Sequence, residues 1–267
     1  MKKFLLSTFT VFITATMYSQ IPADCGQCMD CRNDCGPFNK RGERKEIIST
    51  LLNVAPYDGI IHIGVKRAGQ STRYSTATFI DKDVMITANH NVMTSLMITS
   101  IQFNIRKNGK DVWITLGIGD FEILHFTRRH DKWNDVALIW IKNLKPFGDY
   151  KYTIFNTADI GQITTNVDDL FHLTGFPCDK PDILMDKTTQ KANLEFDATN
   201  TIISYSNLFT CTGDSGAPLW IEKEGKFYIV GIHHGGDDIN AFPEKNETNI
   251  SRKLTPNILN WIKRMLQ

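Results

Sequence analysis

The chain has 267 residues and a formal net charge of +1, with 42% hydrophobic and 22% charged residues. This length and apolar content suffice for one large or two small domains with a buried core. The near-zero net charge gives no basis for binding nucleic acid or an anionic membrane surface. The composition is that of an ordinary globular protein, so function must be sought in particular residues.

The N-terminal residues MKKFLLSTFTVFITATMYSQ contain two lysines, an apolar stretch from Phe4 to Met17, and then small polar residues. This pattern predicts a signal peptide over residues 1–19 and a secreted product, extracellular or periplasmic. The apolar stretch is short and interrupted by threonines, which argues against a membrane anchor. We therefore expect no membrane association.

A group of four cysteines follows, in the segment CGQCMDCRNDCG that begins at Cys25 and includes Cys35. Four thiolates could hold zinc, but oxidation to disulfides is the favoured fate of cysteines after export. The next residues, PFNKRGERK, are polar and charged. We interpret residues 20–44 as a cysteine-rich pro-segment or small appendage outside the main core, so that the protein would be made as a zymogen.

Short apolar or alternating segments recur from Ile60 onward, separated by Gly, Asn and Asp. Their brevity and their Ile, Val, Thr and Phe content predict the strands of an all-β fold. The expected strands are residues 60–65, 76–80, 84–88, 100–105, 112–119, 121–126, 135–141, 170–176, 217–221 and 226–232. Residues 142–152 are the candidate linker, which predicts one β domain over 45–148 and a second over 149–267.

The C-terminal residues TPNILNWIKRML have a different pattern. Thr255 can cap a helix and Pro256 suits its first position. The apolar residues that would share one face are Ile258, Leu259, Ile262 and Leu266. A short amphipathic helix is therefore expected to end the chain.

Ser215 lies in the segment FTCTGDSGAPLW, after Gly213 and Asp214 and before Gly216. A nucleophilic serine needs a base for its proton and donors for the oxyanion that forms on a substrate carbonyl. A tight turn of small residues can aim consecutive backbone N–H groups at one point. The N–H groups of Gly213 and Ser215 are the candidate oxyanion hole.

Two further motifs supply the other groups that such a serine requires. His90 ends an apolar segment in VMITANHNV and is the candidate base, and Asp135 precedes an apolar strand in KWNDVALIWI. A desolvated carboxylate there could hold the imidazole in one tautomer. Asp131 competes for this role but is not directly against the strand. Each motif alone is common, whereas their joint occurrence predicts a triad of His90, Asp135 and Ser215.

The segments TANH, NDVALI and GDSGAPL resemble the three active-site motifs of chymotrypsin-fold serine proteases. LTGFPCDKP (173–181) and IVGIHHGG (229–236) resemble segments of the bacterial glutamyl endopeptidases of the staphylococcal type. The resemblance runs from about Val54 to the C-terminus. It implies two six-stranded antiparallel β-barrels, with the histidine and aspartate on the first and the serine on the second. It also implies a peptide hydrolase that takes protein or peptide substrates. We expect a monomer with no cofactor and no metal-ligating residues in the site, and the sequence leaves a calcium requirement open.

The resemblance also extends to a specificity pocket. The residue six before the serine is Phe209, so the acid that would bind Lys or Arg substrates is absent there. Thr210 and His233 match the residues that bind an acidic side chain, which implies cleavage after Glu and, second, after Asp. Alternatively, they only complete a polar pocket wall and the specificity is different. His234 would face the other side of its strand, near the triad, although the two histidines could exchange roles.

Three more residues depart from, or add to, this pattern. Asp214 stands where glutamyl endopeptidases commonly carry asparagine; it resembles the trypsin-type enzymes, where this acid receives a freed N-terminal ammonium. The fold would bring Cys178 and Cys211 beside the oxyanion turn, where a disulfide would make the turn rigid.

A second class of function stays open: a protease-fold binding protein that has lost catalysis. We expect ordinary structural or surface roles for the histidines without ligand spacing, His62, His125, His130 and His172. The glycosylation sequons at Asn246 and Asn249 indicate a surface loop.

Overall fold

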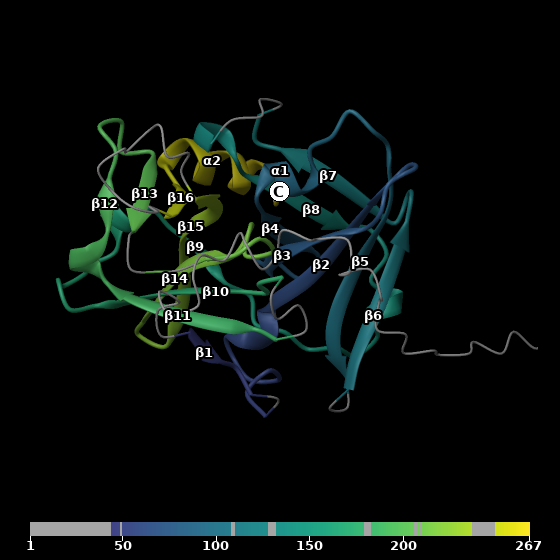
Figure 1. Cartoon of the computed structure of the whole chain (residues 1–267), viewed down its shortest axis with the longest axis horizontal. Helices are drawn as coiled ribbons and strands as arrows, with labels where there is room; N and C mark the ends of the chain where they lie inside the picture. The colour runs from purple at the N-terminus through teal and green to yellow at the C-terminus, as the bar shows by residue number, and fades with distance from the viewer. Residues whose placement is uncertain are drawn as a thin grey trace, which may run out of the picture.

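The computed structural model describes residues 44–48, 50–107, 110–127, 132–178, 183–205, 208, 210–236 and 249–267. These residues form two curled β-sheets that lie beside each other, with helix α2 (Pro256–Met265) at one edge of the contact between them (Figure 1). The predicted signal peptide and the cysteine-rich group lie outside the described residues.

The first sheet contains seven antiparallel strands, in the order β6-β5-β2-β3-β4-β8-β7. Their bounds are β2 Ile60–Arg67, β3 Arg73–Phe79, β4 Val84–Thr87, β5 Ile98–Lys107, β6 Lys110–Gly117, β7 Phe121–His125 and β8 Ala137–Ile141. All seven strands overlap segments expected from the sequence, because each presents alternating or continuous apolar residues to a buried side.

The second sheet contains nine strands, in the path β1-β11-β10-β14-β15-β16-β13-β12, and β9 pairs with β15. Their bounds are β1 Arg44–Glu46, β9 Asn156–Thr157, β10 Leu170–Gly175, β11 Met185–Gln190, β12 Glu195–Phe196, β13 Ile202–Tyr205, β14 Pro218–Lys223, β15 Lys226–Gly236 and β16 Asn249–Lys253. All pairs are antiparallel except the short β9–β15 pair, which is parallel.

Two antiparallel β-sheets and a C-terminal helix confirm the expected fold class, but the described residues form seven and nine strands where six and six were predicted. Part of the excess in the second sheet comes from β1, β9 and β12, which have only two or three residues each. Residues 45 and 46, predicted to begin the first barrel, instead pair with β11 of the second sheet. The strands with the most polar sequences, such as MDKTTQ in β11, lacked the apolar alternation needed to predict them.

One apolar core lies between the two sheets. It includes Ile86 and Leu138 from the first sheet, Trp220 and Ile229 from the second, and Trp261 from α2. Each barrel also has its own core. The core of the first lies around Phe103 and Leu116, and that of the second around Phe171 and Leu219. The shared core fixes the two sheets against each other, and so it fixes the residues that they carry to their contact.

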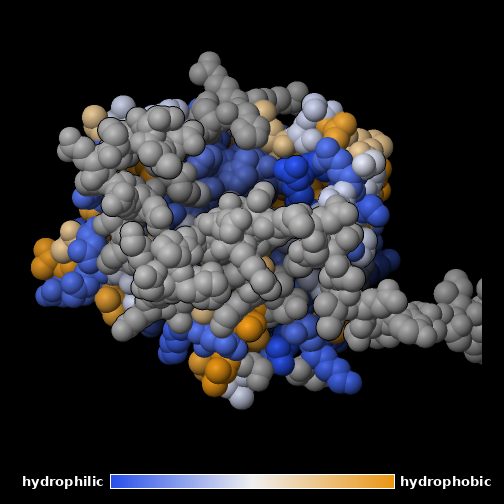
Figure 2. Space-filling model, viewed as in Figure 1, coloured by the Kyte–Doolittle hydropathy of each residue, from blue (hydrophilic) through white to orange (hydrophobic). Residues whose placement is uncertain are grey.

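Helix α2 confirms the predicted C-terminal helix, and it buries Ile258, Trp261 and Ile262. Thr255 stands at the N-cap position, but its side chain makes no capping hydrogen bond, contrary to the expectation. Among the described residues, no helix combines the length and the apolar character needed to cross a membrane. On the face seen in Figure 2, hydrophilic residues gather in the upper centre, close to where Figure 1 shows the short helix α1 (Asn89–Val92).

Candidate active site

His90 and Asp135 meet at the ends of two neighbouring strands of the first sheet. His90 lies in α1, which begins directly after β4, and Asp135 directly precedes Val136 and strand β8, which pairs with β4. The His90 ring Nδ1 lies 2.7 Å from Asp135 Oδ2, and the His90 backbone N–H donates to Asp135 Oδ1 at 2.8 Å. The carboxylate therefore fixes both the ring and the backbone of His90, as the predicted base–orienter pair requires.

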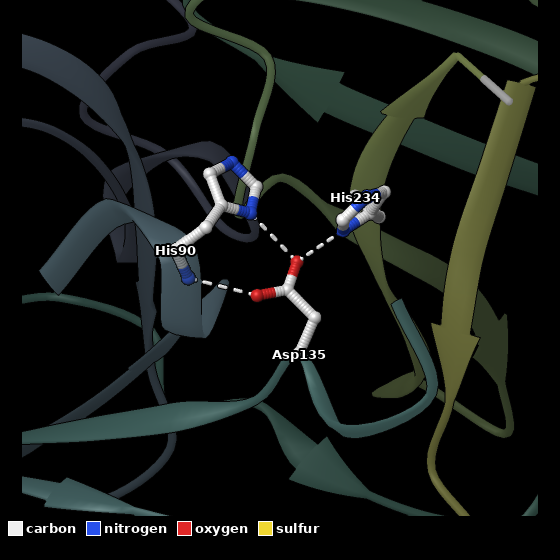
Figure 3. A group of neighbouring side chains, drawn as sticks. All are labelled: His90, Asp135 and His234. Carbon is white, nitrogen blue, oxygen red and sulfur yellow. Dashed lines mark hydrogen bonds and ion pairs between the residues drawn. The ribbon is translucent and has the colours of Figure 1, made fainter. Parts of the chain in front are cut away.

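A second imidazole, that of His234, also contacts Asp135. The His234 ring Nδ1 lies 2.5 Å from the same Oδ2 that contacts His90 (Figure 3). Burial by itself raises the pKa of Asp135, but the hydrogen bonds from His234 and His90 outweigh it and hold the pKa well below its ordinary value. The Asp135 side chain is only 3% exposed, so it is a buried carboxylate that stays ionised because two donors face it.

These three residues also form the one group among the described residues with the donor set for a metal ion, with ligand atoms within 4.8 Å of one another. Ligands of tetrahedral Zn²⁺ at about 2.0 Å from the metal lie about 3.3 Å apart. The two nitrogen–oxygen separations here, 2.7 and 2.5 Å, are shorter and match hydrogen bonds. The arrangement therefore fits shared protons better than a shared metal ion.

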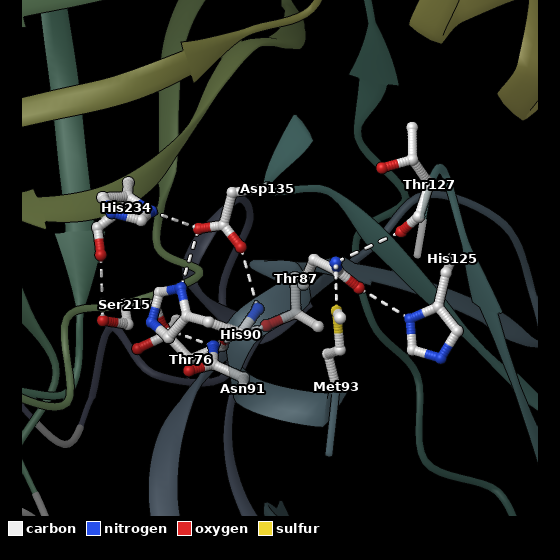
Figure 4. A network of polar contacts seen from close by, with 11 residues as sticks. Thr76, Thr87, His90, Asn91, Met93, His125, Thr127, Asp135, Ser215 and His234 are labelled. Carbon is white, nitrogen blue, oxygen red and sulfur yellow. Dashed lines mark hydrogen bonds and ion pairs between the residues drawn. The ribbon is translucent and has the colours of Figure 1, made fainter. Parts of the chain in front are cut away.

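Ser215 joins this group from the second sheet. Its Oγ donates to the backbone carbonyl of His234 at 3.2 Å, and its own carbonyl accepts from the Asn91 side chain at 3.0 Å (Figure 4). The His234 and His90 rings are 5.1 Å apart and nearly perpendicular. The structure thus brings His90, Asp135 and Ser215 to one place, with His234 and Asn91 as the connecting residues.

The turn that carries Ser215 depends on two glycines with positive φ. Gly213 has φ of +95° and Gly216 has φ of +85°. A Cβ atom at Gly213 would lie 2.5 Å from the Phe176 carbonyl oxygen, and one at Gly216 would lie 2.2 Å from the Thr76 carbonyl oxygen. Only glycine allows this backbone to pass so close to its neighbours, which explains the small residues around the serine.

Thr76 of β3 holds this turn from the first sheet. Its backbone N–H donates to the Ser215 carbonyl at 3.0 Å, and its hydroxyl donates to the Gly213 carbonyl at 3.0 Å. The same hydroxyl accepts from the Phe176 N–H at 3.1 Å. Thr76 is fully buried, so it connects the two sheets at the candidate oxyanion hole. No sequence signal pointed to this role, because a threonine in a strand is an ordinary β residue.

The two residues predicted to bind an acidic side chain both lie against β16. His233 is buried at 1% exposure, and its Nδ1 lies 2.6 Å from the Tyr205 hydroxyl. The Tyr205 hydroxyl in turn lies 2.9 Å from Ser251 Oγ. The Thr210 hydroxyl donates to Asn249 Oδ1 at 2.5 Å. The structure therefore supports each predicted residue with a polar partner that the sequence analysis did not identify.

His233 is held in its neutral form. Burial lowers its pKa well below the ordinary value, and the charge of Lys187 acts in the same direction. Burial also raises the pKa of Tyr205, so its hydroxyl keeps its proton. A neutral imidazole can still donate one N–H, but it adds no positive charge to a pocket.

Several other expectations have a definite outcome. His62, His125 and His172 have structural contacts: His62 stacks on Phe176, His125 Nδ1 lies 2.6 Å from Asn89 Oδ1, and His172 stacks on Trp220. Asn249 is a buried residue of β16 and not part of a surface loop. The expectations for Phe209, His130, Asp131 and Asn246 lie outside the described residues.

The two curled antiparallel β-sheets, with these motifs at their contact, form a chymotrypsin-like double β-barrel fold. No family model and no curated protein matches the sequence. A solved structure of a Glu endopeptidase is similar, with a TM-score of 0.60 and 17% identity. The match covers 84% of this chain and 96% of the other. This likeness confirms the fold that the motifs implied.

Proposed function

We propose that this protein is a secreted serine endopeptidase that uses His90, Asp135 and Ser215. The observation that carries the proposal is the buried Asp135 carboxylate, which binds both the ring and the backbone of His90 beside the turn of Ser215. A merely structural ion pair would not require a serine turn with two glycines at positive φ next to it. The chymotrypsin-like fold of the similar Glu endopeptidase supports the same class of chemistry.

The geometry supports the following sequence of steps. With the Nδ1 proton of His90 donated to Asp135, its Nε2 is the free acceptor for the Ser215 proton. The Ser215 hydroxyl now donates to the His234 carbonyl, so it must rotate toward His90 when substrate binds. Ser215 Oγ then attacks the carbonyl carbon, the N–H groups of Gly213 and Ser215 stabilise the oxyanion, and His90 returns the proton to the leaving amine. Water then hydrolyses the acyl-enzyme: His90 accepts a proton from the attacking water and gives it to Ser215 Oγ as the acid product leaves.

The proposed specificity is for Glu before the scissile bond, with Asp second. Its support is the match of Thr210 and His233 to the expected pocket positions and the similarity to a Glu endopeptidase. The Tyr205 contact on His233 Nδ1 is consistent with this, because a proton donated by Tyr205 leaves the His233 proton on Nε2. A neutral imidazole N–H and a hydroxyl are donors that suit a carboxylate, and the Thr210 hydroxyl would turn from Asn249 Oδ1 to the substrate on binding. A protease of another specificity is the competing outcome.

The activity is tested with the purified protein, a peptide-substrate library and a phosphonate probe that labels reactive serines. We expect labelling at Ser215 and cleavage after Glu, and Ser215→Ala should lower turnover by about 10⁶-fold with little change in stability. Near-wild-type turnover of Ser215→Ala would refute the triad. Correct folding with neither labelling nor cleavage would instead favour the protease-fold binding protein.

We also propose that Cys178 and Cys211 pair with each other and that the N-terminal segment is removed after export. The pairing is supported by the 2.7 Å hydrogen bond from the Cys178 N–H to the carbonyl of Thr212, the residue that follows Cys211. Peptide mapping with and without reduction tests the pairing. N-terminal sequencing of the secreted protein tests the processing site.

A further inference from the structure

Asp214, next to the candidate nucleophile, is paired with a lysine from within the chain. Lys187 Nζ donates to Asp214 Oδ2, and the two side chains are 2% and 0% exposed. Lys187 lies on β11, between partners on β10 and β1. Burying an unpaired charge this deeply would strongly destabilise the folded protein. The Lys187 ammonium and the Asp214 carboxylate can therefore be buried here because they pair with each other.

The Asp214 carboxylate is also part of the turn that carries Ser215. Its Oδ2 accepts from the Cys211 N–H at 2.9 Å. The Asp214 N–H donates to the Cys211 carbonyl at 3.0 Å, and the Asp214 carbonyl accepts from the Ala217 N–H at 2.8 Å. The residue therefore closes the turn on both sides of Ser215, and moving its carboxylate would move the N–H groups of Gly213 and Ser215.

The environment of Lys187 shows that its side chain belongs to the inside of the barrel, toward the proposed pocket. Its charge is among the causes that lower the pKa of His233, and the Asp214 charge contributes to raising that of Tyr205. Asp186, its neighbour along β11, points the other way and contacts His172 and Thr174. The alternation of a β-strand explains why only Lys187 reaches the turn.

We infer that Lys187 is a positioning residue, whose ammonium holds Asp214 and thereby forms the oxyanion hole of the proposed protease. The inference rests on the proposed function. In trypsin-type enzymes, which the GDSG segment resembles, the same acid receives the ammonium of a newly freed N-terminus. Here the cation comes from strand β11, so the turn of Ser215 requires no chain cleavage to reach its active form. Any effect of an N-terminal pro-segment must then act elsewhere, for example by covering the site.

The first experiment replaces Lys187 by methionine, with Lys223→Met as the matched control. Lys223 also pairs with an aspartate of the second sheet, Asp169, but that pair is partly exposed. For Lys187→Met we expect kcat and the labelling rate of Ser215 to fall by at least about 100-fold, the size of losing an oxyanion-hole donor, with KM changed by less than threefold. Lys223→Met should stay within about threefold of the wild type.

A second measurement separates this inference from the proposed function. Hydrogen exchange of the peptide 211–217 reports the turn without requiring activity, and Lys187→Met should lose protection there. If the wild type were inactive, the proposed function would fail while the exchange result would still test Lys187. If the wild type were active and a folded Lys187→Met variant kept its turnover and its protection, the role of Lys187 would be refuted.

Lys187→Met leaves an unpaired buried carboxylate, which can prevent folding. The double variant Lys187→Met/Asp214→Asn removes both charges, and we expect it to fold with kcat at least tenfold below the wild type. Turnover within threefold of the wild type would overturn the inference.

The last experiment adds two residues ahead of the processed N-terminus, which displaces its ammonium by several ångströms. With Lys187 as the cation, the labelling rate should change by less than about threefold. A 100-fold loss would show that a terminal ammonium forms the site.

Discussion

His234 Nδ1 lies 2.5 Å from Asp135 Oδ2, on the same oxygen that accepts the proton of His90. One carboxylate therefore orients two imidazoles, one from α1 beside the first sheet and one from β15 of the second sheet. The His234 backbone carbonyl also accepts from Ser215 Oγ, so His234 contacts two members of the proposed triad.

His234→Phe tests the shared carboxylate. Without the second donor, Asp135 interacts more strongly with protonated His90, so we expect the acid limb of the kcat/KM profile to move to higher pH. We also expect kcat to fall about tenfold as Asp135 becomes less fixed. His234→Gln, which can restore an N–H donor, should recover part of the loss. An unchanged pH profile in folded His234→Phe would mean that His234 only packs against the site.

Thr76→Val tests the connection between the sheets at the oxyanion turn. The substitution keeps the shape but removes a hydroxyl that bonds to Gly213 and Phe176, and it leaves buried polar groups without partners. We expect a loss of about 1–3 kcal/mol in the free energy of unfolding and a fall in kcat of about tenfold.

Thr78→Val is the matched control for this experiment. Thr78 lies two residues further along β3 and is fully buried, but within the described part of the chain its hydroxyl has no hydrogen-bond partner. Its replacement should be neutral or stabilising. Equal effects of the two valine substitutions on kcat would contradict the role of Thr76.

Tyr205→Phe tests the proposed recognition of Glu. The change removes the hydroxyl that contacts His233 Nδ1 while the aromatic ring stays. We expect kcat/KM for Glu peptides to fall about tenfold relative to matched Gln peptides, because the imidazole proton is no longer directed to Nε2. Since His233 is neutral in the folded protein, the Glu-to-Gln ratio of the wild type should stay constant between pH 5.5 and 8. Equal losses on both peptides would indicate a structural role for this network.

His62→Phe tests the effect of a buried neutral histidine on acid stability. Burial lowers the pKa of His62 from 6.5 to about 3, so below pH 6.5 the unfolded chain binds a proton that the folded protein does not. The free energy of unfolding must therefore decrease as the pH falls from 6.5 toward 3, by up to about 1.4 kcal/mol per pH unit from this residue. Denaturant unfolding of His62→Phe at pH 4 to 7.5 should show a shallower decline by that amount. Parallel curves for the two proteins would show that His62 is protonated in the folded state.

Much of the candidate site was predictable because its chemistry restricts the residue types close to it in sequence. A nucleophile turn needs glycines such as Gly213 and Gly216 at positive φ, and the orienting acid Asp135 stands directly before a buried strand. Both signals are local, and so is the apolar alternation that revealed the strands of the first sheet. The amphipathic pattern of α2 was likewise readable because helix periodicity depends only on neighbouring residues.

The partners of these residues depended on contacts between distant parts of the chain. Lys187 in the polar segment MDKTTQ looks exposed until β11 pairs with β10 and β1, and Thr76 reaches Gly213 across 137 positions of sequence. Which imidazole shares Asp135 was likewise settled by the placement of β15 against the first sheet. By itself the sequence determined which chemical groups the site contains, because those groups are encoded in short motifs. Only the tertiary structure decided what holds and neutralises them, because that follows from strand register and from the packing of one sheet on the other.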